Sequence, residues 1–185
     1  MSTAYYYVVA TLPALRWGES APVPRAAVLA MAAEWLPAAD AQALAALEEM
    51  GGMDEVDEGH ATHRPAALTA WHAFDTALRN ALAVARAARR GLDAAPFLRP
   101  GEPLDAATRA VVQDCVKLDD PLKAEQALDQ ARWAFLDNLC AAHMFDFTAL
   151  LCYVLKLALL ERWQAFNVEA GTVCVHSLLT GVSTT

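Results

Sequence analysis

The segment that most constrains the fold is DFTALLCYVLKLALLERW, residues 146–163, because large apolar side chains occupy nearly every side of the helix it would form. Its longest uninterrupted apolar stretch, residues 149–160, contains Lys156 and is too short to cross a bilayer, which takes about 20 residues. In a protein without membrane spans, a helix of this kind is surrounded by other helices. We therefore expect residues 147–166 to form the central helix of an all-α bundle.

Alanine determines how such a bundle would pack. The chain has 185 residues, of which 41 are alanine, while 8% are aromatic. Alanine favours helix and adds little side-chain volume, so the helices must approach one another closely. The few large side chains are then expected to anchor the core: Trp35, Trp71, Phe74, Trp133, Phe135, Phe147 and Trp163.

Capping residues and chain breaks divide the sequence into about six or seven helices. Asp40, Asp105, Asp120 and Asp146 each stand where an N-cap is expected, and Gly91 stands where a helix should end. Prolines separate the first helices, since proline fixes φ and biases the residue before it away from helix. The expected helices cover residues 25–36, 41–50, 65–90, 106–117, 121–143, 147–166 and 168–179.

One segment argues against an entirely helical chain. Tyr5 to Thr11, YYYVVAT, is rich in aromatic and β-branched residues, which favour a strand. A lone strand would leave its backbone unpaired, and the sequence offers only a weak partner around Val173 to Val175. Pairing there, pairing across a dimer and a short helix are the three alternatives, so the all-α expectation leaves room for a short strand near the N-terminus.

Residues 51–64 are expected to form an acidic loop that contains glycine, and this loop is the candidate boundary between two parts of the chain. The length suits one helical domain spanning residues 1–185. The alternative is two lobes whose boundary falls in the loop 51–64.

Charge and composition exclude several partners. The formal net charge is −8 and the isoelectric point is near 5, which argues against nucleic acid and anionic lipid as main partners.

The first residues do not have the pattern of a signal peptide, and the four cysteines form no CxxC pair. We expect a cytoplasmic protein with reduced thiols and no direct membrane insertion, which can be peripheral to a membrane only through a partner.

Signals for catalysis are weak. The sequence has no glycine-rich phosphate loop and no recognised nucleophile setting, so no cofactor and no enzymatic activity are expected. His60 and His63 form an HxxH pair beside four acidic residues, which is an acceptable set of metal ligands. Glycine before this pair and proline after it indicate a loop rather than a helix. We therefore interpret it as part of a solvated acidic loop and expect no metal.

Lys156 is the most informative single charge, because it lies within the apolar helix. A buried ammonium group needs a carboxylate partner. Asp129, Asp137 and Glu161 are the candidates. The alternative is that the methylene stem is buried while the amine reaches solvent.

Arg79, Arg86, Arg89 and Arg90 form an arginine stripe on the helix expected over 65–90. Asp75 lies one turn before Arg79 on this helix and can pair with it. Such a stripe is usually a solvated face. The functional alternative is a docking surface that meets an acidic helix of a partner protein.

Four segments together resemble a known family: YYYVVATLPAL, WHAFDTALRNALAVARAARRG, ARWAFLDNL and YVLKLALLERWQAF. In this order they are similar to a small bacterial family of unknown function that is found with subunits of V-type (A/V-type) ATP synthases. The matching positions are Tyr5, Tyr6, Tyr7, Trp71, Arg79, Asn80, Arg132, Trp133, Lys156, Glu161, Arg162 and Trp163.

The resemblance implies a helical, non-enzymatic accessory, stalk or assembly component that contacts V-type ATPase subunits. It is similar in style to the larger C/d-type subunit, and it implies no catalytic role for any residue. The alternative function is a helical chaperone or adaptor that holds an amphipathic peptide in an apolar groove. Tyr5, Tyr6 and Tyr7, with the arginine stripe, are the candidate partner-binding residues.

Overall fold

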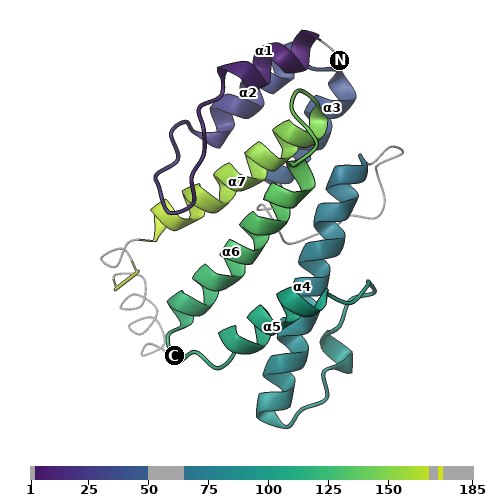
Figure 1. The fold of residues 1–185 in the computed structure, drawn as a ribbon, viewed down its shortest axis with the longest axis vertical. Coiled ribbons are helices and arrows are strands. Elements are labelled where there is room, and N and C mark those ends of the chain that lie inside the picture. The colour runs from purple at the N-terminus through teal and green to yellow at the C-terminus, as the bar shows by residue number, and fades with distance from the viewer. Residues whose placement is uncertain (1–2, 50–64, 167–170, 173–185) are drawn as a thin grey trace, which may run out of the picture.

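The computed structural model describes residues 3–49, 65–166 and 171–172, and the elements within these ranges are helical (Figure 1). No strand occurs in the described part of the chain, so the expected all-α bundle is confirmed. In the described ranges the elements follow one another as α1 (Thr3–Thr11), α2 (Arg25–Trp35), α3 (Ala38–Glu49), α4 (Ala66–Arg90), the short 3-10 helix η1 (Ala95–Phe97), α5 (Ala106–Cys115), α6 (Pro121–Cys140) and α7 (Phe147–Ala165).

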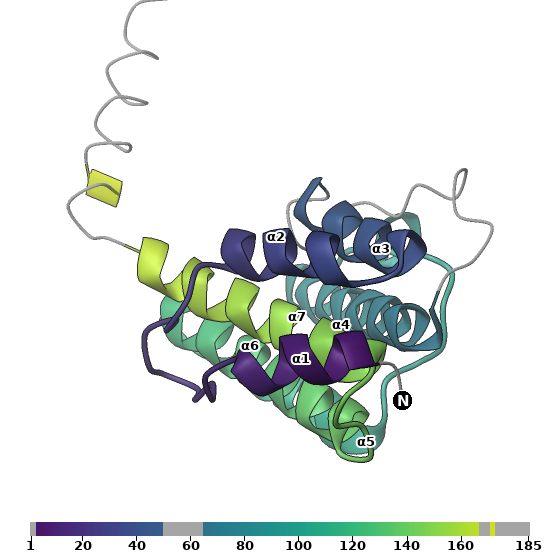
Figure 2. The same ribbon diagram turned by 90° about the horizontal axis from the view of Figure 1, so that it is seen from above.

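The central position of α7 is also confirmed. It contacts α1, α2 and α3 on one side and α4 and α6 on the other, as Figures 1 and 2 show. Its fully enclosed side chains point in several directions around the helix, as the sequence pattern predicted. They are Leu150, Leu151, Cys152, Val154, Leu155, Leu157, Leu159 and Leu160.

The segment YYYVVAT forms helix α1, so the expected strand is wrong and the short-helix alternative holds. Tyr5 and Val8, three residues apart, are buried on one face of α1, which packs against α2 and α7. A helix satisfies its own backbone groups, whereas a strand here would have no partner in the described residues. The hydroxyl of Tyr5 donates a hydrogen bond to Asp40 in α3, and burial raises the pKa of this tyrosine.

The helix ends follow the predicted caps in most cases. The carboxylates of Asp105, Asp120 and Asp146 accept backbone N–H groups of the first turns of α5, α6 and α7 at 2.9, 2.9 and 3.0 Å. Gly91 ends α4 with φ +65°, the left-handed conformation in which glycine is favoured.

The expected cap at Asp40 is wrong. Helix α3 starts earlier, because the carbonyl of Pro37 already accepts the backbone N–H groups of Asp40 and Ala41. Asp40 therefore lies inside the first turn, where its carboxylate meets Tyr5 instead of a backbone amide.

The aromatic anchors are confirmed in the half of the bundle around α4 and α6. Trp71, Phe74 and Trp133 are buried, and the rings of Phe74 and Phe135 stack with centroids 4.0 Å apart. Trp35 is the exception: it is 44% exposed and packs on the ring of Tyr7 near the surface. Its position at the last residue of α2 leaves no helix to cover it.

Several expectations fall on residues that the structure does not describe. The proposed lobe boundary at 51–64, with His60 and His63, lies outside the described ranges, as does nearly all of the helix expected over 168–179. Among the described residues, no helix is both long enough and apolar enough to cross a membrane.

Candidate functional site

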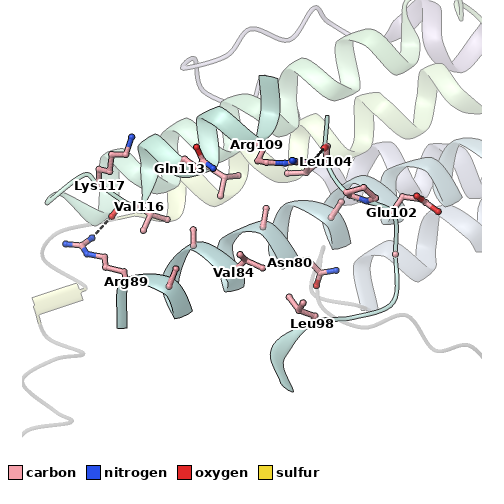
Figure 3. A pocket seen from close by; sticks show the side chains of 17 residues that line it. Asn80, Val84, Arg89, Leu98, Glu102, Leu104, Arg109, Gln113, Val116 and Lys117 are labelled. Atoms are coloured by element: carbon pink, nitrogen blue, oxygen red, sulfur yellow. Dashed lines mark hydrogen bonds between the residues drawn. The ribbon is translucent and has the colours of Figure 1, made fainter. Parts of the chain in front are cut away.

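A groove with a volume of about 1010 Å³ runs between α4 and α5, and residues 98–104 contribute a third wall (Figure 3). Small side chains of α4 line one side of it. Because they recur every three or four residues, they share one face of the helix, and their methyl groups leave open the space that larger residues would fill. They are Ala77, Ala81, Ala85 and Ala88.

Larger apolar side chains complete the groove. Leu104 and Val112 are buried at its base, while Val84 and Leu98 are exposed at its edge. An exposed concave surface of this kind is typical of a site that another apolar surface covers.

Charged side chains lie at both ends of the groove, and Arg109 lies with Leu104 toward the end that carries Glu102 (Figure 3). Arg89 and Lys117 lie at one end, and Glu102 lies at the other. Arg89 donates a hydrogen bond to the carbonyl of Val116, and Lys117 forms an exposed ion pair with Asp114 at 2.8 Å.

Asn80 holds the segment that forms the third wall. Its amide nitrogen donates to the carbonyl of Arg99 at 2.7 Å, and its side-chain oxygen accepts the backbone N–H of Arg99 at 2.9 Å. On the opposite side, Arg109 donates to the carbonyl of Leu104 at 2.7 Å. These contacts tie residues 98–104 to α4 at one end and to α5 at the other, which fixes the position of the third wall.

Replacing Asn80 by alanine is expected to lower the free energy of unfolding by about 1 kcal/mol, because two hydrogen bonds are lost at an exposed position. Amide hydrogen exchange of residues 98–104 should become faster than in the wild type. Asn138→Ala, an exposed substitution near the end of α6, is the control. Unchanged exchange in this segment would show that Asn80 does not hold the wall.

The groove lining offers no pair of groups for nucleophilic catalysis. Apart from Arg89, Arg109 and Lys117, its polar side chains are those of Asn80, Glu102 and Gln113. Nucleophilic catalysis requires a serine, cysteine or similar group beside a base, and neither a hydroxyl nor a thiol lines the groove.

The arginine stripe divides into two parts. Arg79 donates to Asp75 at 2.7 Å, which agrees with the predicted pairing one turn apart. Arg86, Arg89 and Arg90 line a second cavity at the end of α4, beside the groove. Arg89 and Val116 border both cavities, so the basic residues adjoin the positive end of the groove.

A buried ionic network joins α4, α6 and α7. Arg132, only 5% exposed, donates to Asp75 at 2.9 Å and to Asp129 at 2.8 Å. Asp129 is fully buried and also accepts hydrogen bonds from Arg162 and, at 2.9 Å, from the indole N–H of Trp163. Paired in this way, the buried charges fix how the three helices meet.

Lys156 contacts one of its three predicted partners. Its amine lies 2.5 Å from Asp137, whose side chain is largely exposed, and 5.3 Å from the ring centre of Trp133. The side chain of Lys156 is 12% exposed, and the carboxylate of Asp137 is the partner that its ammonium group requires. Asp129 is not the partner, because its oxygens already bind the network arginines.

The tyrosines are not neighbours of the groove. Tyr5 is buried, whereas Tyr6 and Tyr7 are exposed and contact the rings of Phe145 and Trp35 in tilted arrangements. The described residues contain no group of three or more His, Cys, Asp or Glu placed to hold a metal ion.

The sequence did not reveal the groove or the network. A signal for the groove existed in the alanine face of α4 and in residues 96–103, which contain three prolines and were expected to be a loop. For the network, the pairing of Asp75 with Arg79 was visible. The position of Arg132 between two helices was not, since its partner Asp75 is 57 residues away.

Comparison with known proteins identifies one family model. Residues 108–182, from α5 onward, match the family described as "Protein of unknown function (DUF2764)". The match includes most of the α5 wall of the groove but not the α4 wall. No curated protein and no solved structure matches the chain significantly. The family description names no function, and the association with V-type ATP synthases stays a prediction.

Proposed function

We propose that this protein is a non-enzymatic accessory component, in the stalk or in assembly, of a bacterial V-type ATP synthase. It binds another subunit through the α4–α5 groove. The observation that carries the binding role is the groove itself: an open apolar channel over the alanine face of α4, with a buried base and charged ends. The resemblance of four sequence segments to a family found with these ATPases supports the choice of partner.

An amphipathic helix is the occupant that fits this channel best. Helices bind in grooves by placing apolar side chains, three or four residues apart, against small residues of the partner. The alanines of α4 leave room for such side chains, and Val84 and Leu98 would cover their flanks. Arg89 and Lys117 favour a helix whose acidic end lies beside them.

Co-purification tests the proposal. A tagged protein expressed from its own gene is expected to carry the subunits of the ATPase soluble sector through two purification steps, as identified by mass spectrometry. Its absence both from intact complexes and from assembly intermediates would refute the ATPase role. Genes for ATPase subunits beside its own would agree with the proposal.

A chaperone or adaptor that binds amphipathic peptides is the second candidate, since the same groove could hold them. Tyr5, Tyr6 and Tyr7, the other candidate partner-binding residues, do not line this groove. Binding of many unrelated amphipathic peptides with similar affinity would favour the chaperone. Binding confined to one ATPase subunit would favour the accessory role.

A further inference from the structure

A second cavity, of about 410 Å³, lies where the last turn of α4, the end of α5 and the first turns of α6 meet. Three arginines of α4 line it, and Glu125 of α6 is the one acidic residue in its lining. We call it the arginine cavity. Its lining consists of Leu82, Arg86, Arg89, Arg90, Cys115, Val116, Leu118, Pro121, Ala124, Glu125 and Leu128.

The positive charges of this cavity are incompletely neutralised. Glu125 lies 4.0 Å from Arg86 and is shared with Arg162, which is closer to it at 3.6 Å. Arg89 donates to a backbone carbonyl, which carries no full charge. Arg90 forms no ion pair or hydrogen bond with the described residues. Three guanidinium groups therefore face one shared carboxylate.

Two other acidic groups of this region, Asp114 and Asp120, do not line the cavity and bind other groups. Asp114 pairs with Lys117 at 2.8 Å. Asp120 accepts the first backbone N–H groups of α6 and lies 4.0 Å from Lys123. Neither carboxylate removes the excess of positive charge around Arg86, Arg89 and Arg90.

The base of the cavity is apolar. Leu82 and Leu128 are buried beneath the arginines, and Leu118 is exposed at the edge. Burial raises the pKa of the Cys115 thiol, so this side chain adds no negative charge at neutral pH.

The chemistry of the lining selects a compact dianion. Guanidinium groups bind phosphate oxygens through paired N–H donors, and one phosphoryl group can accept from two or three of them. An extended polyanion such as nucleic acid is disfavoured, because the protein carries a net charge of −8. The leucines beside the arginines offer a surface for an apolar or ring-shaped body.

We propose that the arginine cavity binds a phosphorylated small molecule, with Arg86, Arg89 and Arg90 holding its phosphoryl group and Leu82, Leu118 and Leu128 contacting its body. This site is separate from the alanine face that receives the partner helix. Because Arg89 and Val116 border both cavities, an occupied arginine cavity would lie beside the positive end of the groove.

Calorimetric titration of the full chain with inorganic phosphate, pyrophosphate and phenyl phosphate tests this proposal. Saturable binding is expected for each, and phenyl phosphate should bind more tightly than inorganic phosphate because its ring covers the leucines. Arg86→Gln and Arg90→Gln should each weaken binding roughly tenfold, as expected for the loss of a charge-assisted hydrogen bond. Both arginines are exposed, so the variants should retain the thermal stability of the wild type.

Arg99→Gln is the matched control, because its side chain is exposed and lines neither cavity. Sodium chloride at equal ionic strength controls for screening. The proposal is overturned if titration with the phosphate probes gives no saturable binding heat above that measured with sodium chloride. It is also overturned if Arg99→Gln weakens phosphate binding as much as Arg90→Gln does. Tighter binding of a glutamate-rich peptide than of pyrophosphate would also overturn it, since that result assigns the arginines to an acidic protein.

Discussion

Replacing Asp129 by alanine is expected to lower the free energy of unfolding by about 3–5 kcal/mol, the largest effect of any single substitution considered for this protein. Asp129 is fully buried and accepts hydrogen bonds from Arg132, Arg162 and Trp163. Without it, Arg132 remains buried with Asp75 as its only carboxylate. Removing one partner of a buried ionic network leaves a charge that the interior cannot solvate.

Urea unfolding followed by far-ultraviolet circular dichroism measures this effect. Asp137→Ala is the matched control: it removes a carboxylate on the same helix that also binds a cation, Lys156. Because Asp137 is largely exposed, that substitution should cost about 1 kcal/mol or less. Equal losses in the two variants would contradict the structural role assigned to the network.

If the proposed ATPase subunit binds in the α4–α5 groove, replacing Ala85 by phenylalanine is expected to weaken that binding at least about a hundredfold, which corresponds to roughly 2.7 kcal/mol. Ala85 lies among the small residues that line the groove. A benzyl group at this position would fill the space in which the proposed partner helix would lie. The protein itself should stay folded, since the new ring enters an open groove rather than a filled core.

The affinity of the purified variant for the ATPase soluble sector, measured by biolayer interferometry, decides this prediction. Ala73→Phe is the matched control, because Ala73 is an exposed residue of the same helix and does not line the groove. Thermal unfolding of both variants shows whether the fold is intact. Wild-type affinity in Ala85→Phe would place the partner's binding surface elsewhere.

The chain's local signals were sufficient for most helices, because these signals act within a few residues. Asp105, Asp120 and Asp146 cap the helices they were expected to cap, and Gly91 ends α4. The apolar character of residues 147–165 predicted a helix enclosed by its neighbours, and α7 is that helix.

The N-terminal segment shows where local signals fail. Its β-branched and aromatic residues favour a strand, yet Tyr5 and Val8 are buried only because α1 is helical and lies against α2 and α7. Propensity differences of this kind are small beside the burial of two side chains, so packing overrides them. Trp35 shows the opposite case, since its size predicted an anchor and its place at the end of α2 left it exposed.

The sequence by itself determined that this is an all-α protein, where most of its helices begin and end, and which helix lies at the centre. These properties depend on residues close together in the chain. Only the tertiary structure decided that Arg132 would join Asp75 to Asp129, that Lys156 would reach Asp137, and that the alanines of α4 would face an open groove. Each of these depends on the distance between helices far apart in sequence, which the packing of the whole bundle sets.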